Sequence, residues 1–227
     1  MINDALLQWS AEQPGARRWD RPGAIAIAVP DLSRRDRLAI HGEPAAVAGL
    51  VREVLPAVGP TYRPLGAEDL VVEVADRVPD LEVAGRFAWM DVTVPVGGAG
   101  GGWLTDAELP EVAALLDTDF PDSFARPGGR GVRRWAGVRD GSGRLVAVAA
   151  DAWSTSSVGF LAGVATRADL RGRGLARAVC GFVVDDLLAG RDRVALFADY
   201  WNVAAVTTYS RMGFDLRPVA AARVIGS

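Results

Sequence analysis

The sequence predicts an α/β fold of the α+β kind, in which a mixed sheet is flanked by helices. Apolar runs of strand length alternate with segments of helical periodicity in both halves of the chain. Two β-rich runs are joined by the turn DGSG at 140–143, which is a hairpin signal. A third apolar run, at 158–166, leads through a Gly-rich turn into a helix expected at 172–189. With 227 residues, 50% of them hydrophobic, the chain can bury a substantial core.

A glycine-rich segment, GGAGGG at 97–102, divides the chain. Such a segment could cradle a phosphate, but no Lys follows it and no helix starts directly after it. We therefore interpret the segment as a flexible linker. It separates an N-terminal α/β region, residues 1–100, from a second domain at 103–227.

The first region reads as mixed α/β, with helical spacing at Ala46, Leu50 and Val54. It shows no dense cluster of catalytic residue types, and we interpret His41 at a strand end as a surface or structural residue. The expected elements are strands at 23–30, 36–41 and 81–95, and helices at 43–58 and around 67–75.

The second region is more regular, and no internal repeat is evident in the sequence. Thr105 or Asp106 is expected to cap its first helix, and Gly190 to end the helix at 172–189. The expected elements are helices at 108–116, 172–189 and 203–212, strands at 133–139, 144–153, 158–166 and 193–199, and two closing strands at 214–219 and 221–225.

The composition excludes several classes of enzyme. All 25 basic residues are Arg, so the chain lacks the Lys that P-loop enzymes, protein kinases and Schiff-base pyridoxal enzymes need. The single Cys excludes an intramolecular disulfide and a thiolate zinc cluster. The single His excludes multi-His metal sites. The G-x-S-x-G motif that carries the nucleophile of many Ser–His–Asp enzymes is not present in the sequence. We expect chemistry without a metal.

The charge balance and hydropathy bear on partners and location. A formal net charge of −3 argues against a nucleic-acid partner, because phosphate-binding proteins carry excess positive charge. The first twenty residues lack the pattern of a signal peptide, and no apolar run approaches the ~18 residues that span a membrane. We expect a cytoplasmic protein that has no membrane partner.

The turn RGRGLA at 171–176 carries the most chemical information. The first turn of a helix has unpaired N–H groups and the positive end of the helix dipole. Gly172 and Gly174 remove side chains that would keep an anion away, while Arg171 and Arg173 add positive charge. The pattern suits a diphosphate. By itself it is equally compatible with a tight, solvated connection, and the dinucleotide fingerprint G-x-G-x-x-G is not met.

Two motifs together resemble the GCN5-related N-acetyltransferase (GNAT) family. Arg171, Gly174 and Ala176 fit its R/Q-x-x-G-x-G/A motif, between a strand and an amphipathic helix. Its second signature is matched downstream by Asn202, Tyr209, Gly213 and Phe214. The resemblance covers about 103–227 and implies a mostly antiparallel sheet with a splayed pair of parallel strands. The N-terminal half resembles the family loosely, as a degenerate copy would.

The resemblance implies acetyl-CoA as co-substrate and no metal. The cofactor would lie where strands 158–166 and 193–199 splay apart. Its pantetheine arm would bond along the first of them near Val164 and Thr166, and Asn202 could orient that arm. The diphosphate would be held by the backbone N–H groups of Arg171, Gly172, Arg173, Gly174, Leu175 and Ala176.

The implied reaction is direct attack of a primary amine on the thioester. A strand N–H near Val164 would face the oxyanion, and Tyr209 matches the general acid that protonates the leaving thiolate. Bland alternatives stay open: Asn202 is a good N-cap in any protein, and Tyr209 could be a core aromatic with its hydroxyl at the surface.

The sequence leaves the base and the acceptor open. Asp151 and Asp199 are the nearest candidates for the base, and a water chain would serve equally well. The acceptor would be a small-molecule or peptide amine, and a homodimer is compatible with the sequence. The resemblance implies that loops 117–130 and 215–222 would form the acceptor site. The acidic loop could suit a cationic amine, or it could simply be a solvated loop; its residues are Asp117, Asp119, Phe120 and Asp122. Trp153 and Trp201 could line a pocket or serve packing, and we interpret Cys180 as an inert core thiol.

A different class of function fits the same residues. A fold with an intact cofactor turn could serve as a non-catalytic acyl-CoA-binding or interaction module. The absence of an acid on strand 158–166 favours the module, while Tyr209 favours the enzyme.

Overall fold

The computed structural model describes residues 4–98 and 100–226, and these form two compact units. The N-terminal unit takes the chain up to Trp89, together with Phe197–Val203 and the residues from Leu216 onward. The C-terminal unit takes Met90–Leu196 and Ala204–Asp215. The units therefore do not follow a single cut in the chain, and the division at 1–100 and 103–227 stays a prediction about domains.

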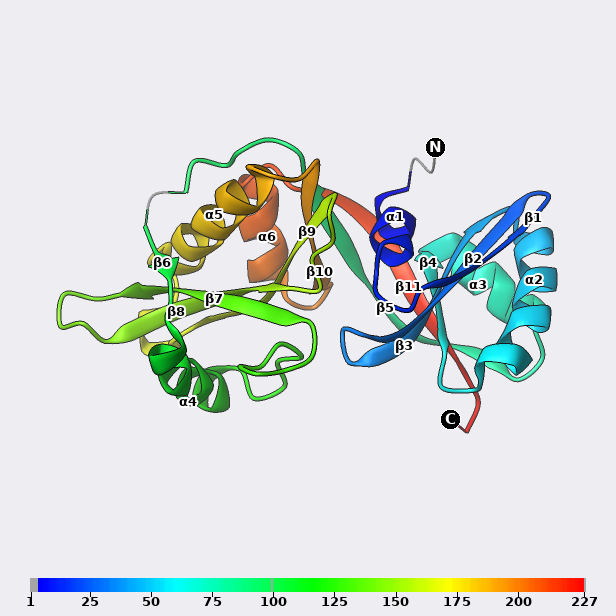
Figure 1. Cartoon of the computed structure of the whole chain (residues 1–227), viewed down its shortest axis with the longest axis horizontal. Helices are drawn as coiled ribbons and strands as arrows, with labels where there is room; N and C mark the ends of the chain where they lie inside the picture. The colour runs from blue at the N-terminus through cyan, green and yellow to red at the C-terminus, as the bar shows by residue number, and fades with distance from the viewer. Residues whose placement is uncertain (1–3, 99, 227) are drawn as a thin grey trace. The chain divides into compact units, whose positions relative to one another are not determined.

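The N-terminal unit is a mixed sheet with three helices (Figure 1). Its strand order is β1-β2-β3-β4-β11-β5, in which β3 and β4 are parallel while β1–β2, β2–β3 and β4–β11 are antiparallel. The predicted strands and helices of this region are confirmed. The elements are α1 (Ala5–Ala11), β1 (Arg17–Arg21), β2 (Ala24–Leu32), β3 (Arg35–Gly42), α2 (Pro44–Val58), β4 (Arg63–Ala67), α3 (Glu68–Arg77), β5 (Leu81–Val92) and β11 (Asp215–Val224).

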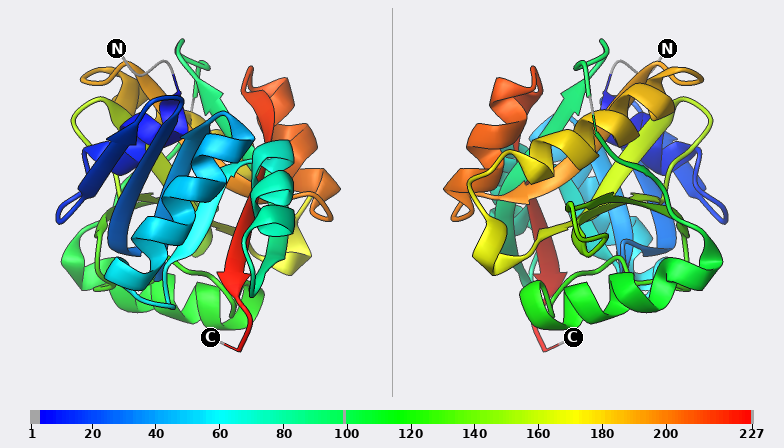
Figure 2. Two further views of the ribbon diagram at one scale, coloured as in Figure 1. Left: turned by 90° about the vertical axis from the view of Figure 1, so that its right-hand side faces the viewer. Right: turned by 90° about the vertical axis from the view of Figure 1, so that its left-hand side faces the viewer.

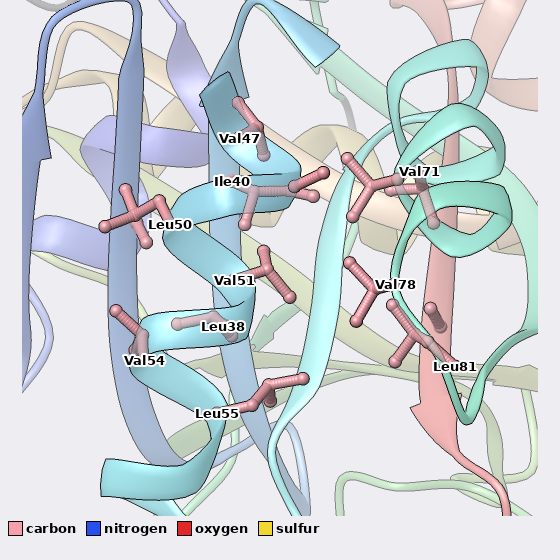
Figure 3. Packing of buried hydrophobic residues seen from close by; sticks show 14 of the residues in the cluster. Leu38, Ile40, Val47, Leu50, Val51, Val54, Leu55, Val71, Val78 and Leu81 are labelled. Carbon is pink, nitrogen blue, oxygen red and sulfur yellow. The ribbon is translucent and has the colours of Figure 1, made fainter. Parts of the chain in front are cut away.

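Helices α2 and α3 lie side by side over one face of this sheet (Figure 2, left). The helical spacing in α2 turns Val47, Leu50, Val51 and Val54 toward the strands, where they are buried (Figure 3). Leu38 and Ile40 of β3 meet them from the sheet. Ala46 packs at the edge of the same cluster.

In the C-terminal unit the strands follow the order β10-β9-β8-β7-β6. The β9–β10 pair is parallel, and the remaining pairs are antiparallel. The expected helices and strands are confirmed, except that one strand, β11, stands where two closing strands were predicted. The elements are β6 (Gly102–Trp103), η1 (Asp106–Glu108), α4 (Leu109–Asp119), β7 (Val132–Arg139), β8 (Leu145–Ala152), β9 (Val158–Thr166), η2 (Ala168–Leu170), α5 (Leu175–Leu188), β10 (Arg193–Asp199) and α6 (Val203–Arg211).

Helices cover both faces of this sheet. Figure 2 (right) shows α5 and α4 on it, and β8 between them is buried along its whole length. The first helical turn begins at a capping box, in which Thr105 and Glu108 exchange hydrogen bonds, so Thr105 is the cap and not Asp106. Burial on both faces holds the neighbouring strand β9 in a fixed position.

The two halves of the chain repeat one order of elements. With β6 and the short 3-10 helices left aside, each has a helix and three antiparallel strands, followed by a helix, a strand parallel to the third, a helix and a last strand. Each parallel pair is also equally short: β3–β4 and β9–β10 both pair over three residues. The sequence does not show this repeat, because it resides in topology and not in residue identity.

The beginning of the glycine-rich segment is held against α5 and is not a flexible linker there. The Asp185 carboxylate of α5 accepts the N–H groups of Val96 and Gly98, at 2.7 and 2.9 Å. Gly98 and Gly181 approach so closely that a Cβ on Gly98 would clash with the backbone of Gly181. Ala99 lies outside the described residues. Because the Asp185 carboxylate would repel a phosphate, its position also argues against phosphate binding by this segment.

Over residues 4–98 and 100–226, every helix is too short or too polar to cross a membrane.

Candidate functional site

A β-bulge interrupts β9 at the centre of the predicted site. Val148 pairs with Ala165 and Ala150 pairs with Ala162, so one residue of β8 faces two residues of β9, Gly163 and Val164. Gly163 has φ +60°, the left-handed conformation typical of the first residue of such a bulge. A bulge leaves one residue out of the ladder, so it turns a backbone N–H away from β8. The predicted oxyanion donor near Val164 lies within this bulge.

Trp135 fixes the conformation of the bulge. A Cβ on Gly163 would lie 2.5 Å from Cη2 of Trp135 and 3.1 Å from the Ala125 Cβ, so only glycine fits. Trp135 is 1% exposed and is therefore held in place by its surroundings. Sequence reasoning missed both residues. The available signal was a Gly inside a strand, which often marks a bulge.

The parallel pairing of β9 with β10 ends before the bulge. It covers Val158–Phe160 and Arg193–Ala195, as expected for a pair that splays. Val164 and Thr166 lie beyond the paired stretch. The Oγ1 of Thr166 is buried and has no hydrogen-bond partner among the described residues. A buried hydroxyl without a partner costs free energy, which a ligand able to bond it would recover.

The Gly-rich turn presents a run of free backbone donors. Gly172 and Gly174 have φ +76° and +78°, and a Cβ on either would meet no protein atom within 4 Å. Gly174 is the N-cap of α5. The first helical hydrogen bond runs from the Ala178 N–H to the carbonyl of Gly174. Over the described part of the chain, the N–H groups from Gly172 to Arg177 make no hydrogen bond. This open, positively polarised turn fits a diphosphate.

Arg171 contributes to the turn differently from what the sequence suggests. Its backbone N–H lies 3.5 Å from the carbonyl of Ala168, so it is already engaged. Its guanidinium donates to the carbonyls of Thr166 and Asp119. Arg171 therefore braces the turn from its flank, while Arg173 is exposed and keeps its charge available.

Tyr209 is buried and touches Cys180. The tyrosine is 7% exposed and its hydroxyl hydrogen-bonds to the thiol on α5, so the hydroxyl does not lie at the surface. Burial, with Cys180 as a further cause, raises the pKa of Tyr209 well above its ordinary value. Burial also raises the pKa of the Cys180 thiol to about 12, against a smaller opposing effect of the Tyr209 hydroxyl. Both groups are protonated at neutral pH, as an acid requires and an inert core thiol implies.

The other predicted residues occupy varied positions. Asn202 is exposed directly before α6, where its N–H bonds the carbonyl of Asp199. Asp199 ends β10 and is exposed. Asp151 is 2% exposed and is occupied, since Arg134 and the Ser154 hydroxyl both donate to its carboxylate. Asp151 is thus a structural carboxylate.

The acidic loop is largely paired within the unit. Asp117 bonds Arg126, and the Asp119 carboxylate accepts the N–H of Ala168. Asp119 therefore stabilises the turn after β9 and is not free to bind a cationic amine. Phe120, Asp122 and Trp201 are exposed, while Trp153 is 5% exposed. His41, in the other unit, is exposed with Nδ1 3.7 Å from an oxygen of Asp4.

The described residues contain no group of three or more His, Cys, Asp or Glu side chains placed to hold a metal.

Comparison with known families identifies the C-terminal half. The family model described as Acetyltransferase (GNAT) family matches residues 102–214, which include the bulge, the turn and α6. No curated protein matches the chain.

Solved structures share the fold over nearly the whole chain. A GCN5-related N-acetyltransferase from Kribbella flavida has a TM-score of 0.66 at 16% identity, covering 98% of this chain and 94% of that one. An acetyltransferase from Colwellia psychrerythraea scores 0.58 at 14% identity, covering 93% and 87%. A third, from Sphaerobacter thermophilus, scores 0.56 at 16%, covering 88% and 80%. At these identities the likeness establishes the fold, including that of the N-terminal half.

Proposed function

Because residues 102–214 carry a GNAT acetyltransferase domain and so make this chain a member of that family, we propose that it transfers an acetyl group from acetyl-CoA to a primary amine. The observation that carries the proposal is the run of unpaired N–H groups from Gly172 to Arg177. These donors would hold the diphosphate of the co-substrate. Asn202, exposed before α6, is proposed to orient its arm.

The end of β9 supports binding of the pantetheine arm. Beyond Phe160, β9 has no parallel partner strand, so its backbone groups on that edge are open to a ligand. Val164 and Thr166 lie on this stretch, and the Thr166 Oγ1 offers an unused polar atom. An extended amide chain can bond there as an added strand would.

The proposed reaction forms a C–N bond and breaks the C–S bond of the thioester. The neutral amine attacks the carbonyl carbon, and an N–H at the Gly163–Val164 bulge stabilises the oxygen as it gains charge. The thiolate of CoA leaves and takes a proton from the Tyr209 hydroxyl. The attacking nitrogen gives up a proton to water as the amide forms, and a proton from water restores the tyrosine. The raised pKa of Tyr209 keeps its hydroxyl protonated across the neutral range, and it also makes the hydroxyl a weaker acid than that of an ordinary tyrosine.

A non-catalytic acyl-CoA-binding module is the second candidate, and one observation favours it. The Tyr209 hydroxyl is buried and already bonded to Cys180, so proton transfer has to break that bond. A protein that only binds acyl-CoA needs the turn and β9 but not this proton.

We also propose that the N-terminal half is a degenerate copy of the same fold. Its element order and its three-residue parallel pair support this. Between β3 and α2 only Glu43 remains, where the C-terminal half has residues 167–174. Pro44 at the helix start also removes an N–H donor. The copy thus lacks the means to hold a diphosphate, and it would serve another purpose. A cytoplasmic location and the absence of a nucleic-acid partner stay predictions.

The cofactor and the reaction are tested separately. Acetyl-CoA at millimolar concentration is expected to raise the melting temperature of the full chain, because a ligand of the folded state stabilises it. No shift would overturn cofactor binding. Thiol release from acetyl-CoA with a panel of amines then separates enzyme from module: a panel that releases no CoA, with binding intact, favours the module.

Tyr209→Phe tests the acid. We expect turnover to fall at least tenfold while acetyl-CoA affinity stays nearly the same. Tyr62→Phe is the matched control, since Tyr62 is similarly buried at 8% exposure but lies in the N-terminal unit. An unchanged rate in Tyr209→Phe would remove the residue from the mechanism.

A further inference from the structure

Three arginines form a row across the sheet of the N-terminal unit. Arg37 of β3 and Arg63 of β4 are directly paired positions of the parallel ladder. On the next strand, β11, Ala221 pairs with Leu65, so Arg223, two residues further in this antiparallel pair, comes beside Arg63. Neighbouring strands lie about 4.8 Å apart, which brings the three side chains to adjacent positions. We name Arg37, Arg63 and Arg223 the arginine row.

The row lies on the sheet face opposite to α2 and α3. Leu38 and Ile40 belong to the core cluster under those helices, whereas Arg37 does not. Because successive side chains of a strand point to opposite faces, Arg37 is on the other face from Leu38. On β11, Ala220 and Ala222 belong to the cluster, so Arg223, next to Ala222, is on the opposite face. The three guanidinium groups therefore extend from one face.

Arg37 is unusually placed for a charged side chain. It is 7% exposed, its Nε is buried, and no hydrogen bond or ion pair is made by this side chain within the described residues. Burial, and after it the charges of Arg63 and Arg35, lower the pKa of Arg37 to about 10. Burying a charge without a partner is costly, so a buried guanidinium is normally paired with an anion.

The row has too few carboxylates to balance it. Arg223 donates to Glu82 of β5, with 2.7 Å between Arg223 Nη2 and the carboxylate oxygen. For Arg63, burial and then the charges of Arg35 and Arg223 lower the pKa, and no acidic group acts in the other direction. Like charges at paired positions of a sheet destabilise it. The presence of arginines at paired positions therefore indicates that their positive charge has a function.

We propose that the arginine row binds an oxyanion, a phosphate or carboxylate group, on the N-terminal unit. Guanidinium groups match such anions in geometry, since two parallel N–H donors meet two oxygens. The bound group would accept from Arg37 and Arg63 and would neutralise the charge that the chain leaves unbalanced. This site is separate from the Gly-rich turn, which belongs to the other unit.

Inorganic phosphate and succinate are the probes, compared with sodium chloride at equal ionic strength. We expect saturable binding of at least one probe to the full chain by calorimetry, together with a rise in melting temperature beyond that in chloride. Arg37→Met should weaken this binding at least tenfold. Arg63→Met, at a half-exposed position, serves the same purpose if Arg37→Met fails to fold.

Two controls isolate the row. Arg52→Met removes one exposed arginine from α2 of the same unit and should bind the probe as the wild type does. Gly174→Ala alters the turn of the other unit, and binding at the row should survive it. The proposal is overturned if neither probe binds, or if Arg37→Met and Arg63→Met bind as the wild type does. A stronger response to phosphate than to succinate would assign the site to phosphate groups, and the reverse would assign it to carboxylates.

Discussion

The Tyr209 hydroxyl on α6 is hydrogen-bonded to the Cys180 thiol on α5, and both groups are removed from water. The contact links the proposed acid to α5, the helix that starts at the Gly-rich turn. Both groups keep their protons to high pH, because burial disfavours their anions.

Alkaline pH is expected to destabilise the protein through this pair. The pKa of Cys180 is raised to about 12 in the folded chain, while an unfolded thiol titrates near about 8.5. The folded state therefore holds the proton more tightly. Its stabilising contribution is complete below the unfolded pKa and is lost as pH rises from there toward 12. The slope for one group is about 1.4 kcal/mol per pH unit. Urea denaturation at pH 8, 9, 10 and 11 measures it.

Cys180→Ser gives the matched control for this titration. The serine hydroxyl can still bond Tyr209 but does not ionise in this range. Its free energy of unfolding should fall less steeply with pH than that of the wild type. Equal slopes in the two proteins would show that the thiol does not titrate as proposed.

Gly163→Ala is expected to distort the bulge in β9. The new Cβ would lie 2.5 Å from Trp135, and the residue has φ +60°, so the backbone has to move. We expect a loss of about 1–3 kcal/mol in the free energy of unfolding, as for other overpacked sites. A fall in acetyl transfer should accompany it, measured in the same preparation.

Gly141→Ala is the comparison for Gly163→Ala. Gly141 lies in the β7–β8 turn without a positive φ, and no atom lies within 4 Å of a Cβ placed there. This variant should keep wild-type stability and activity. If both alanine variants behaved alike, steric exclusion at the bulge would not be the cause.

Gly174→Ala should weaken acetyl-CoA binding about tenfold or more. Its φ of +78° disfavours an L side chain, at a cost of roughly 1–2 kcal/mol, and the added methyl group projects into the open space over the turn. Gly190→Ala, at the opposite end of α5, has no positive φ and meets no atom within 4 Å. Calorimetric titration should show unchanged affinity for Gly190→Ala. A Gly174→Ala protein with wild-type affinity would contradict diphosphate binding at the turn.

Local sequence signals were sufficient for β9, α5 and the Gly-rich turn, because their apolar periodicity and glycine positions are local properties. They were insufficient for β1, whose sequence RRWDR has no apolar alternation, and for β4, which contains Pro64 and Gly66. Two closing strands were predicted at 214–219 and 221–225, yet β11 runs without a break from Asp215 to Val224 and includes Pro218. Its pairing with β4 runs over Val219–Ala221, so the proline lies outside the bonds that pair these strands.

For the candidate site, the sequence suggested candidate residues but missed Gly163 and Trp135, and it did not show what surrounds the candidates. The hydrogen bond between Tyr209 and Cys180 joins residues on separate helices, so no spacing rule reveals it. The engagement of Asp151 and Asp119 likewise depends on partners brought by the tertiary fold. Residue type indicates that a carboxylate could act as a base, whereas its neighbours decide whether it is free to do so.

The pairing of β11 with β4 has a consequence for biosynthesis. The ribosome completes β4 long before it reaches Val219–Ala221, so the N-terminal sheet waits for the end of the chain with one strand edge uncovered. A polypeptide that stops near residue 100 would keep that edge exposed and tend to aggregate. Expression of residues 103–227 alone would release β11 without the strand it pairs with. Removing either half therefore leaves β4 or β11 without the strand it pairs with.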